Sequence, residues 1–177
     1  MGTHSLIAKQ IDTDTYRTVF CQMNGHLEFQ GAMLLEKFST PEQVDRILDL
    51  GDLYLLYPIL EPNPALPHTL DSPQKNVSVA FQREFGYEDM AARNYTLEEL
   101  GGYDDLIEFV YIMNLKGEWK YFQGGYLEEG LRDVKEDLDL LEKGIDVIKP
   151  PPIDFVGEWF QEEDMDDDPQ EDMSFGL

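Results

Sequence analysis

The strongest strand pattern in the chain is LIEFVYIMNL at residues 106–115, followed by KG at 116–117 and EWKYF at 118–122. Large apolar side chains occupy the odd positions from Phe109 to Leu115, and Val110 and Ile112 lie between them. Successive side chains of a strand point to opposite faces, so both faces of this strand are apolar. The pattern predicts a central strand covered on both sides, with a tight turn into an antiparallel neighbour.

A second hairpin is expected at the N-terminus. Residues 6–11 and 16–22 are rich in β-branched and aromatic side chains, and the polar DTDT at 12–15 suits a short connection. A further strand is predicted at 77–83, where apolar residues resume after a proline-rich segment. The sequence therefore predicts an antiparallel sheet.

Three helices are expected at 28–38, 41–50 and 126–143. Thr40 and Gln43 form a capping box around Pro41, and Gly51 is expected to end that helix. The last helix has an apolar stripe at alternating spacings of four and three, made of Leu127, Leu131, Val134, Leu138 and Leu141. A capping box from Thr96 to Glu99 predicts a short additional helix. The expected fold is α+β, an antiparallel sheet with a few helices packed on it, plus an acidic C-terminal tail.

The chain is expected to divide into three parts. Residues 1–149 form a single globular α+β domain, residues 150–161 form a strap that begins with three prolines, and residues 162–177 form an acidic flexible tail. Two alternatives remain open for the apolar residues from Ile153 to Phe160. They form either a structural strap on the domain or a linear motif that binds a partner.

Charge restricts the possible partners. The chain has 13 Lys plus Arg against 37 Asp plus Glu, a net charge of −24. From Pro150 onward there are ten acidic residues and no basic one, so −10 lies there and −14 remains on residues 1–149. Such a chain is repelled by phosphate, which disfavours direct binding to nucleic acid or to an anionic membrane surface. The expected partner is a basic host protein, and a nucleic-acid-binding protein is the candidate that this charge favours.

The predicted partner-binding residues lie in the tail. Aromatic side chains would serve as anchors, and carboxylates would steer the tail to a basic pocket. These residues are Trp159, Phe160, Glu162, Glu163, Asp164, Asp166, Asp167, Asp168, Glu171 and Asp172.

No motif identifies a reaction. The chain lacks the glycine-rich phosphate loops of nucleotide enzymes, and we predict no catalytic residue, metal or cofactor. Cys21, the only cysteine, is expected to be a buried apolar residue of a strand. The alternative is a small hydrolase or transferase that uses a cleft near the proline-rich loop, with His68 and nearby carboxylates. No secretory signal or membrane span is found, so a cytoplasmic location is expected.

Several segments carry a resemblance to a known family. They are MGTHSLIA at 1–8, YRTVFC at 16–21, NGH at 24–26, Leu34-Leu35, TPE at 40–42 and LGDL at 50–53, with looser matches at 79–84 and 119–122. In these segments the chain resembles small phage and prophage proteins of uncharacterised function, which open on M-G-T-[RH]-S-L-I. It departs from them at MNGH, residues 23–26, where the family has a W-D-G-Y-P-like turn. The resemblance implies an accessory phage protein that acts in the bacterial host cytoplasm.

The resemblance and the charge predict the same class of function. We expect a non-enzymatic acidic accessory protein that binds and inhibits a host protein, in anti-defence or host takeover. Its carboxylates would stand in for the phosphates of a nucleic acid. The sequence leaves its oligomeric state open.

Overall fold

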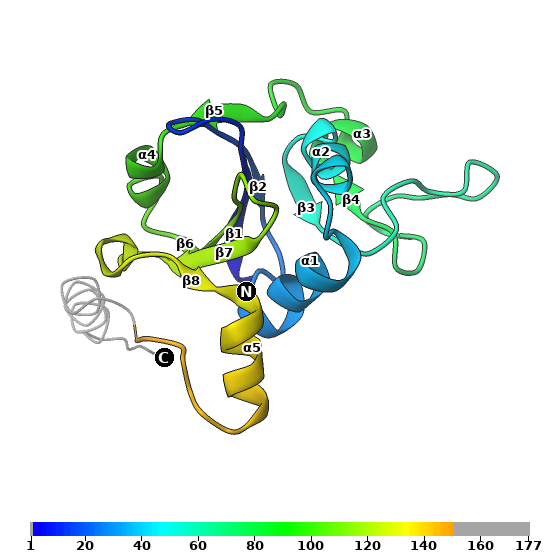
Figure 1. Cartoon of the computed structure of the whole chain (residues 1–177). Coiled ribbons are helices and arrows are strands. Elements are labelled where there is room, and N and C mark those ends of the chain that lie inside the picture. Colours follow the sequence, from blue (N-terminus) through cyan, green and yellow to red (C-terminus); the bar gives the residue numbers. More distant parts are fainter. Residues whose placement is uncertain (1, 151–177) are drawn as a thin grey trace, which may run out of the picture. The chain divides into compact units, whose positions relative to one another are not determined.

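The computed structural model describes residues 2–150, and residues up to Val147 belong to one compact unit. The elements follow one another along the chain as β1 (His4–Gln10), β2 (Tyr16–Cys21), η1 (Leu27–Gly31), α1 (Ala32–Lys37), α2 (Pro41–Asp49), β3 (Leu53–Leu55), β4 (Val79–Ala80), α3 (Phe81–Phe85), β5 (Arg93–Tyr95), α4 (Leu97–Gly101), β6 (Ile107–Met113), β7 (Trp119–Gln123), η2 (Leu127–Glu129), β8 (Arg132–Asp133) and α5 (Val134–Glu142). Figure 1 shows their arrangement.

Within residues 2–150, eight strands form one sheet. Seven follow the order β4-β3-β2-β1-β6-β7-β8, and β5 pairs with the first half of β2. The two predicted hairpins are present, since β1 pairs antiparallel with β2 and β6 with β7. The α+β class predicted from the sequence is confirmed.

The sheet is mixed, however, whereas the sequence predicted only antiparallel pairing. β1 lies parallel to β6, and β2 lies parallel to β3 at Cys21 and Leu53. The β1–β6 pair joins segments about a hundred residues apart. Local patterns do not encode such a pairing, because it depends on the helices and strands that connect the two segments.

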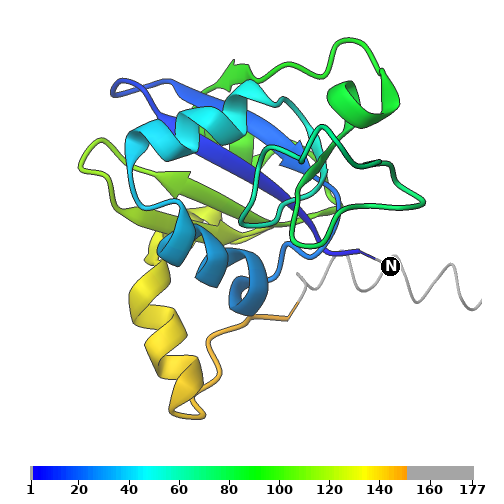
Figure 2. The same cartoon turned by 90° about the vertical axis from the view of Figure 1, so that its right-hand side faces the viewer.

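The sheet separates two cores. Leu6, Ala8, Val110, Ile112 and Phe122 lie in one core, which α4, β5 and the neighbouring loops cover. On the opposite face, α1, α2 and α5 pack against the sheet, as Figure 2 shows for α1 and α2. Every residue of β6 except Glu108 is buried. The prediction of a central strand covered on both sides is therefore confirmed.

The predicted start and end of α2 are both present. Thr40 Oγ1 accepts a hydrogen bond from the backbone N–H of Gln43, and the Gln43 side chain accepts one from the N–H of Thr40. Gly51 ends the helix with φ +79°, and a Cβ at this position would lie 2.4 Å from the carbonyl oxygen of Met90. Only glycine fits there, because both the left-handed backbone and the close approach exclude a side chain.

The strand predicted at 77–83 is wrong beyond its first residues. β4 covers only Val79–Ala80, and the chain then turns into α3. Glu84 explains the change, since its Oε1 accepts a hydrogen bond from the backbone N–H of Ala80 at 2.7 Å. This contact caps the first turn of a helix where the apolar pattern had indicated a strand.

The helix predicted at 126–143 begins later than expected. Residues 127–133 form η2 and β8, and α5 starts only at Val134, where Asp133 accepts a hydrogen bond from the N–H of Glu136. Leu127 packs in the core under α4, and Leu131 is exposed. The apolar periodicity was therefore misleading, because its first two members do not belong to α5.

Candidate functional site

The predicted tail site, from Trp159 to Asp172, lies outside the described residues, and so do the strap and motif alternatives for 153–160. Within residues 2–150, charged and polar groups gather at an acidic face, around a buried histidine and at a pocket with two cations.

The acidic face consists of exposed carboxylates from four neighbouring segments. α4 and the loop before β6 approach η2, since a Cβ at Gly101 would lie 2.5 Å from Leu127 Cδ2. Figure 1 shows α4 and the chain after β7 on the same side of the molecule. The members of the acidic face are Glu98, Glu99, Asp104, Asp105, Glu108 and Glu128.

Local structure holds several of these side chains in place. Glu99 completes a capping box with Thr96 at the start of α4, as the sequence predicted. Asp104 accepts a hydrogen bond from the N–H of Leu106 at 2.8 Å. Glu108 is the extra residue where the pairing of β1 with β6 shifts register, and such a bulge redirects a side chain.

The charge of this face is not neutralised by ion pairs within residues 2–150. Some acidic groups elsewhere do have cation partners, as in Lys9–Asp45 at 2.9 Å and Lys120–Asp133 at 3.0 Å. No basic residue occurs in the sequence between Arg93 and Lys116. That gap is the sequence signal for the acidic face, and we did not identify the face from the sequence.

An apolar residue adjoins the acidic face. Leu106 follows Asp104 and Asp105 directly, and 55% of its surface is exposed. An exposed leucine among carboxylates provides an apolar contact inside a charged rim, an arrangement typical of protein interfaces.

The side chain of His68, the proposed centre of the enzyme alternative, is buried. Its Nδ1 accepts a hydrogen bond from the N–H of Gln74 at 3.0 Å, so the proton resides on Nε2, which donates to the carbonyl of Ser78 at 2.8 Å. Glu84 Oε1 lies 3.9 Å from Nε2, and both side chains are only 4% exposed. His68 meets a carboxylate, but both of its ring nitrogens are engaged.

The partners of Glu84 and Arg83 complete this cluster. Glu84 Oε2 accepts from Arg83 Nε at 2.5 Å, and the other guanidinium nitrogens donate to the carbonyls of Leu60 and Ser78. The cluster ties the proline-rich loop to α3 and β4. The polar groups of the cluster form hydrogen bonds within the fold, and both ring nitrogens of His68 take part. This geometry gives His68 a structural role and does not support a role as general base.

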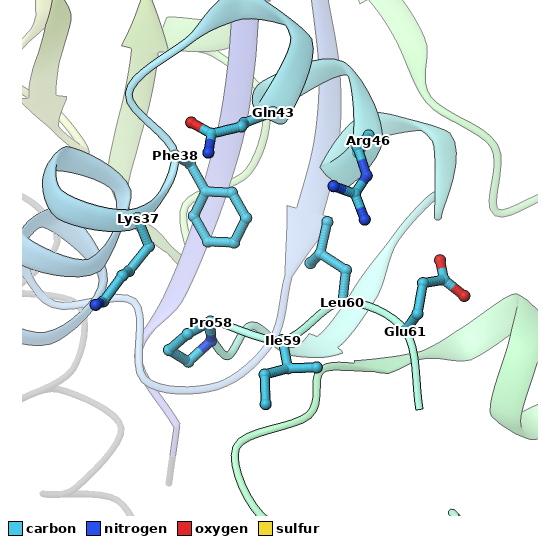
Figure 3. A pocket seen from close by; sticks show the side chains of 8 residues that line it. All are labelled: Lys37, Phe38, Gln43, Arg46, Pro58, Ile59, Leu60 and Glu61. Atoms are coloured by element: carbon cyan, nitrogen blue, oxygen red, sulfur yellow. The ribbon is translucent and has the colours of Figure 1, made fainter. Parts of the chain in front are cut away.

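The pocket lies at the start of the proline-rich loop and has a volume of about 320 Å³. Its walls come from α1, α2 and residues 58–61, and Figure 3 shows their side chains. The lining residues are Lys37, Phe38, Gln43, Arg46, Pro58, Ile59, Leu60 and Glu61. His68 is not among them. The sequence did not predict this pocket, because its two cations carry no motif.

An ion pair between the buried Asp137 and the partly exposed Arg132 anchors the start of α5. Arg132 donates to both carboxylate oxygens of Asp137, at 2.5 and 2.9 Å, and the hydroxyl of Tyr121 donates to Asp137 Oδ2 at 2.7 Å. Burial and the nearby carboxylate raise the pKa of Tyr121 well above its ordinary value. This cluster joins β7, β8 and α5, and it explains why Arg132 lies in a strand instead of in the helix.

Cys21 is fully buried, as expected from the sequence, and burial raises the pKa of its thiol to about 12. Because the thiolate is the reactive form, we expect no reaction with Ellman's reagent at a pH of about 8 in the native state. One thiol per chain should react after unfolding in guanidinium chloride. Rapid labelling of the native protein would contradict this assignment.

Comparison with known proteins finds no match for this chain among protein-family models, curated proteins or solved structures. The resemblance to phage proteins therefore stays a prediction.

Among the residues that the structure describes, no helix has both the length and the apolar character required to cross a bilayer. The same residues contain no group of three or more His, Cys, Asp or Glu side chains placed to hold a metal ion.

Proposed function

We propose that this chain is an acidic accessory protein of the phage type that binds and inhibits a basic host protein by mimicking nucleic acid. The observation that carries the proposal is the acidic face, where six exposed carboxylates lack ion-pair partners within the described residues. The phage origin and the cytoplasmic site of action are part of the proposal and rest on the resemblance to phage proteins, for which residues 1–53 carry most of the weight.

Electrostatics supports a basic partner. Carboxylates without cations nearby produce a negative potential that attracts a basic surface and accelerates association. The net charge of −24 adds to this attraction over longer distances. Leu106 contributes an apolar contact that charge alone would not provide, and buried apolar anchors carry much of the affinity of protein interfaces.

Mimicry explains why the partner is expected to bind nucleic acid. A groove built for phosphates presents Lys and Arg side chains, and carboxylates can form the same charge-assisted hydrogen bonds with them. The carboxylates of the tail, from Glu162 to Asp172, are proposed to add to the same attraction. The protein itself is not expected to bind free DNA or RNA, because its charge repels phosphate.

Salt and competing DNA test the proposal. The immobilised protein should capture a host protein from bacterial lysate at about 50 mM salt and release most of it at about 500 mM, where the screening length falls to a few Å. A short DNA duplex should also displace the captured protein, because both ligands occupy the same basic groove. The readout is the amount of each captured protein by quantitative mass spectrometry.

The control is the pure protein with the duplex alone, for which no gel retardation is expected. Capture that neither salt nor duplex DNA reduces would contradict mimicry. Direct retardation of the bare duplex would contradict the exclusion of nucleic acid as a ligand.

A further inference from the structure

The pocket at α1, α2 and residues 58–61 differs in charge from the rest of the molecule. Lys37 and Arg46 are both at its edge, although the chain has nearly three acidic residues for each basic one. Figure 3 shows the ring of Phe38 between Lys37 and Arg46, with Pro58 and Ile59 below the ring and Leu60 beside it, toward Arg46. The pocket therefore combines an apolar floor with a cationic rim.

The two cations have no partner within residues 2–150. Neither Lys37 nor Arg46 forms an ion pair or a side-chain hydrogen bond there, whereas Lys9, Arg17 and Lys120 are paired with carboxylates. Asp49, one turn after Arg46 on α2, is held instead by Arg17 at 2.9 Å. The positive charge at the pocket is thus available to a ligand.

Gln43 adds a hydrogen-bond donor. Its Oε1 accepts from the N–H of Thr40 in the capping box, which fixes the amide and leaves the side-chain NH₂ for another acceptor. Glu61 is the one carboxylate in the lining, and Arg83 lies 3.6 Å from it. Repulsion of an anionic ligand by Glu61 is therefore reduced.

The floor suits an apolar group. Phe38 and Leu60 are buried, whereas Ile59 keeps 48% of its surface exposed. A ligand that covers Ile59 removes apolar surface from water, which favours binding. A volume of about 320 Å³ is at the lower end for small-molecule pockets, so the ligand is small.

We propose that this pocket binds a small apolar carboxylate. Arg46 and the Gln43 amide hold the carboxylate, Lys37 strengthens the positive field, and the hydrocarbon part lies on Phe38, Ile59 and Leu60. A guanidinium matches a carboxylate in geometry and charge, and an apolar tail matches the floor. The site is separate from the acidic face and independent of the proposed function.

Octanoate is the probe for the test, titrated into the ¹⁵N-labelled protein and followed by amide shifts in two-dimensional NMR. We expect saturable shifts confined to residues 37–61, with a dissociation constant below about 1 mM. Octanol, which has the same chain without the charge, should bind at least roughly tenfold more weakly. Octylammonium should not bind at all.

Arg46→Gln should weaken octanoate binding at least roughly tenfold, and Lys37→Gln should weaken it severalfold. Lys116→Gln is the matched control, since Lys116 is exposed, has no side-chain partner within residues 2–150 and is not in the pocket lining. This control removes the same charge and should change the affinity less than twofold. Arg46 is exposed and unpaired, so its replacement is not expected to affect folding.

Three outcomes would overturn the proposal. They are an absence of saturable binding up to about 10 mM octanoate, equal affinity for octanol, and equal losses in the Arg46 and Lys116 variants. None of these outcomes bears on the acidic face, so this proposal and the proposed function fail separately.

Discussion

Replacing Arg132 with Met is expected to lower the free energy of unfolding by about 3 kcal/mol. The substitution leaves the Asp137 carboxylate, which is 1% exposed, without the cation that now donates to both of its oxygens. The side chain of Arg132 is itself 42% exposed, which places the expected loss at the lower end of the range for broken buried pairs. Urea unfolding followed by tryptophan fluorescence measures the effect.

Lys135→Met is the matched control for this prediction. Lys135 pairs with Asp139 on the same helix at 3.4 Å, but both side chains are more than half exposed. Exposed pairs of this kind contribute little, so the change should stay below about 0.5 kcal/mol. Equal losses in the two variants would show that burial of Asp137 is not the cause.

A double variant separates charge burial from lost packing. In Arg132→Met with Asp137→Asn, the amide carries no charge, and its oxygen can still accept the hydrogen bond from Tyr121. The double variant should recover about 1 kcal/mol relative to Arg132→Met alone. No recovery would mean that the loss comes from the arginine side chain itself.

Neutralising the acidic face is expected to weaken capture of the proposed partner about 100-fold. The variant combines Glu98→Gln, Asp105→Asn, Glu108→Gln and Glu128→Gln, and it leaves out Glu99 and Asp104 because their carboxylates hold local structure. If each of the four carboxylates forms an ion pair of somewhat under 1 kcal/mol with the partner, the variant loses about 3 kcal/mol of binding free energy, which corresponds to about 100-fold weaker binding. Affinity for the partner captured at low salt is measured by surface plasmon resonance.

The matched control removes four exposed carboxylates from other surfaces. It combines Glu28→Gln, Glu36→Gln, Asp71→Asn and Glu142→Gln, none of which forms an ion pair within residues 2–150. Both variants have a net charge of −20, four units above −24. If the two variants weaken capture equally, net charge alone attracts the partner, and the acidic face is not its docking site.

Interactions between residues that are close in the sequence explain most of the features of the fold that the sequence predicted correctly. Each hairpin follows from alternating apolar residues around a polar turn, and the capping boxes at Thr40–Gln43 and Thr96–Glu99 depend on residues three apart. Their free energy comes from neighbours in the chain, so the sequence pattern suffices. The acidic face was predictable in part, because no basic residue lies between Arg93 and Lys116.

Contacts of two buried carboxylates, Glu84 and Asp137, account for the errors. Arg132 lies in β8, before the N-cap Asp133 of α5, and from there its guanidinium pairs with the buried Asp137. The segment after Ala80 turns into α3, where Glu84 caps the first turn and meets His68 from the proline-rich loop. Each of these carboxylates also meets a side chain from another part of the chain, Tyr121 in the case of Asp137 and His68 in the case of Glu84, and the apolar periodicity carries no sign of those contacts.

The sequence by itself determined the α+β class, the two hairpins, the start of α2 and the excess of negative charge, since these follow from composition and from neighbouring residues. Tertiary structure alone decided that β1 lies parallel to β6, that both nitrogens of His68 are engaged, and that Lys37 and Arg46 meet residues 58–61 at one pocket. Those arrangements depend on contacts between residues far apart in the chain, whose free energy exists only once the sheet and its helices have packed.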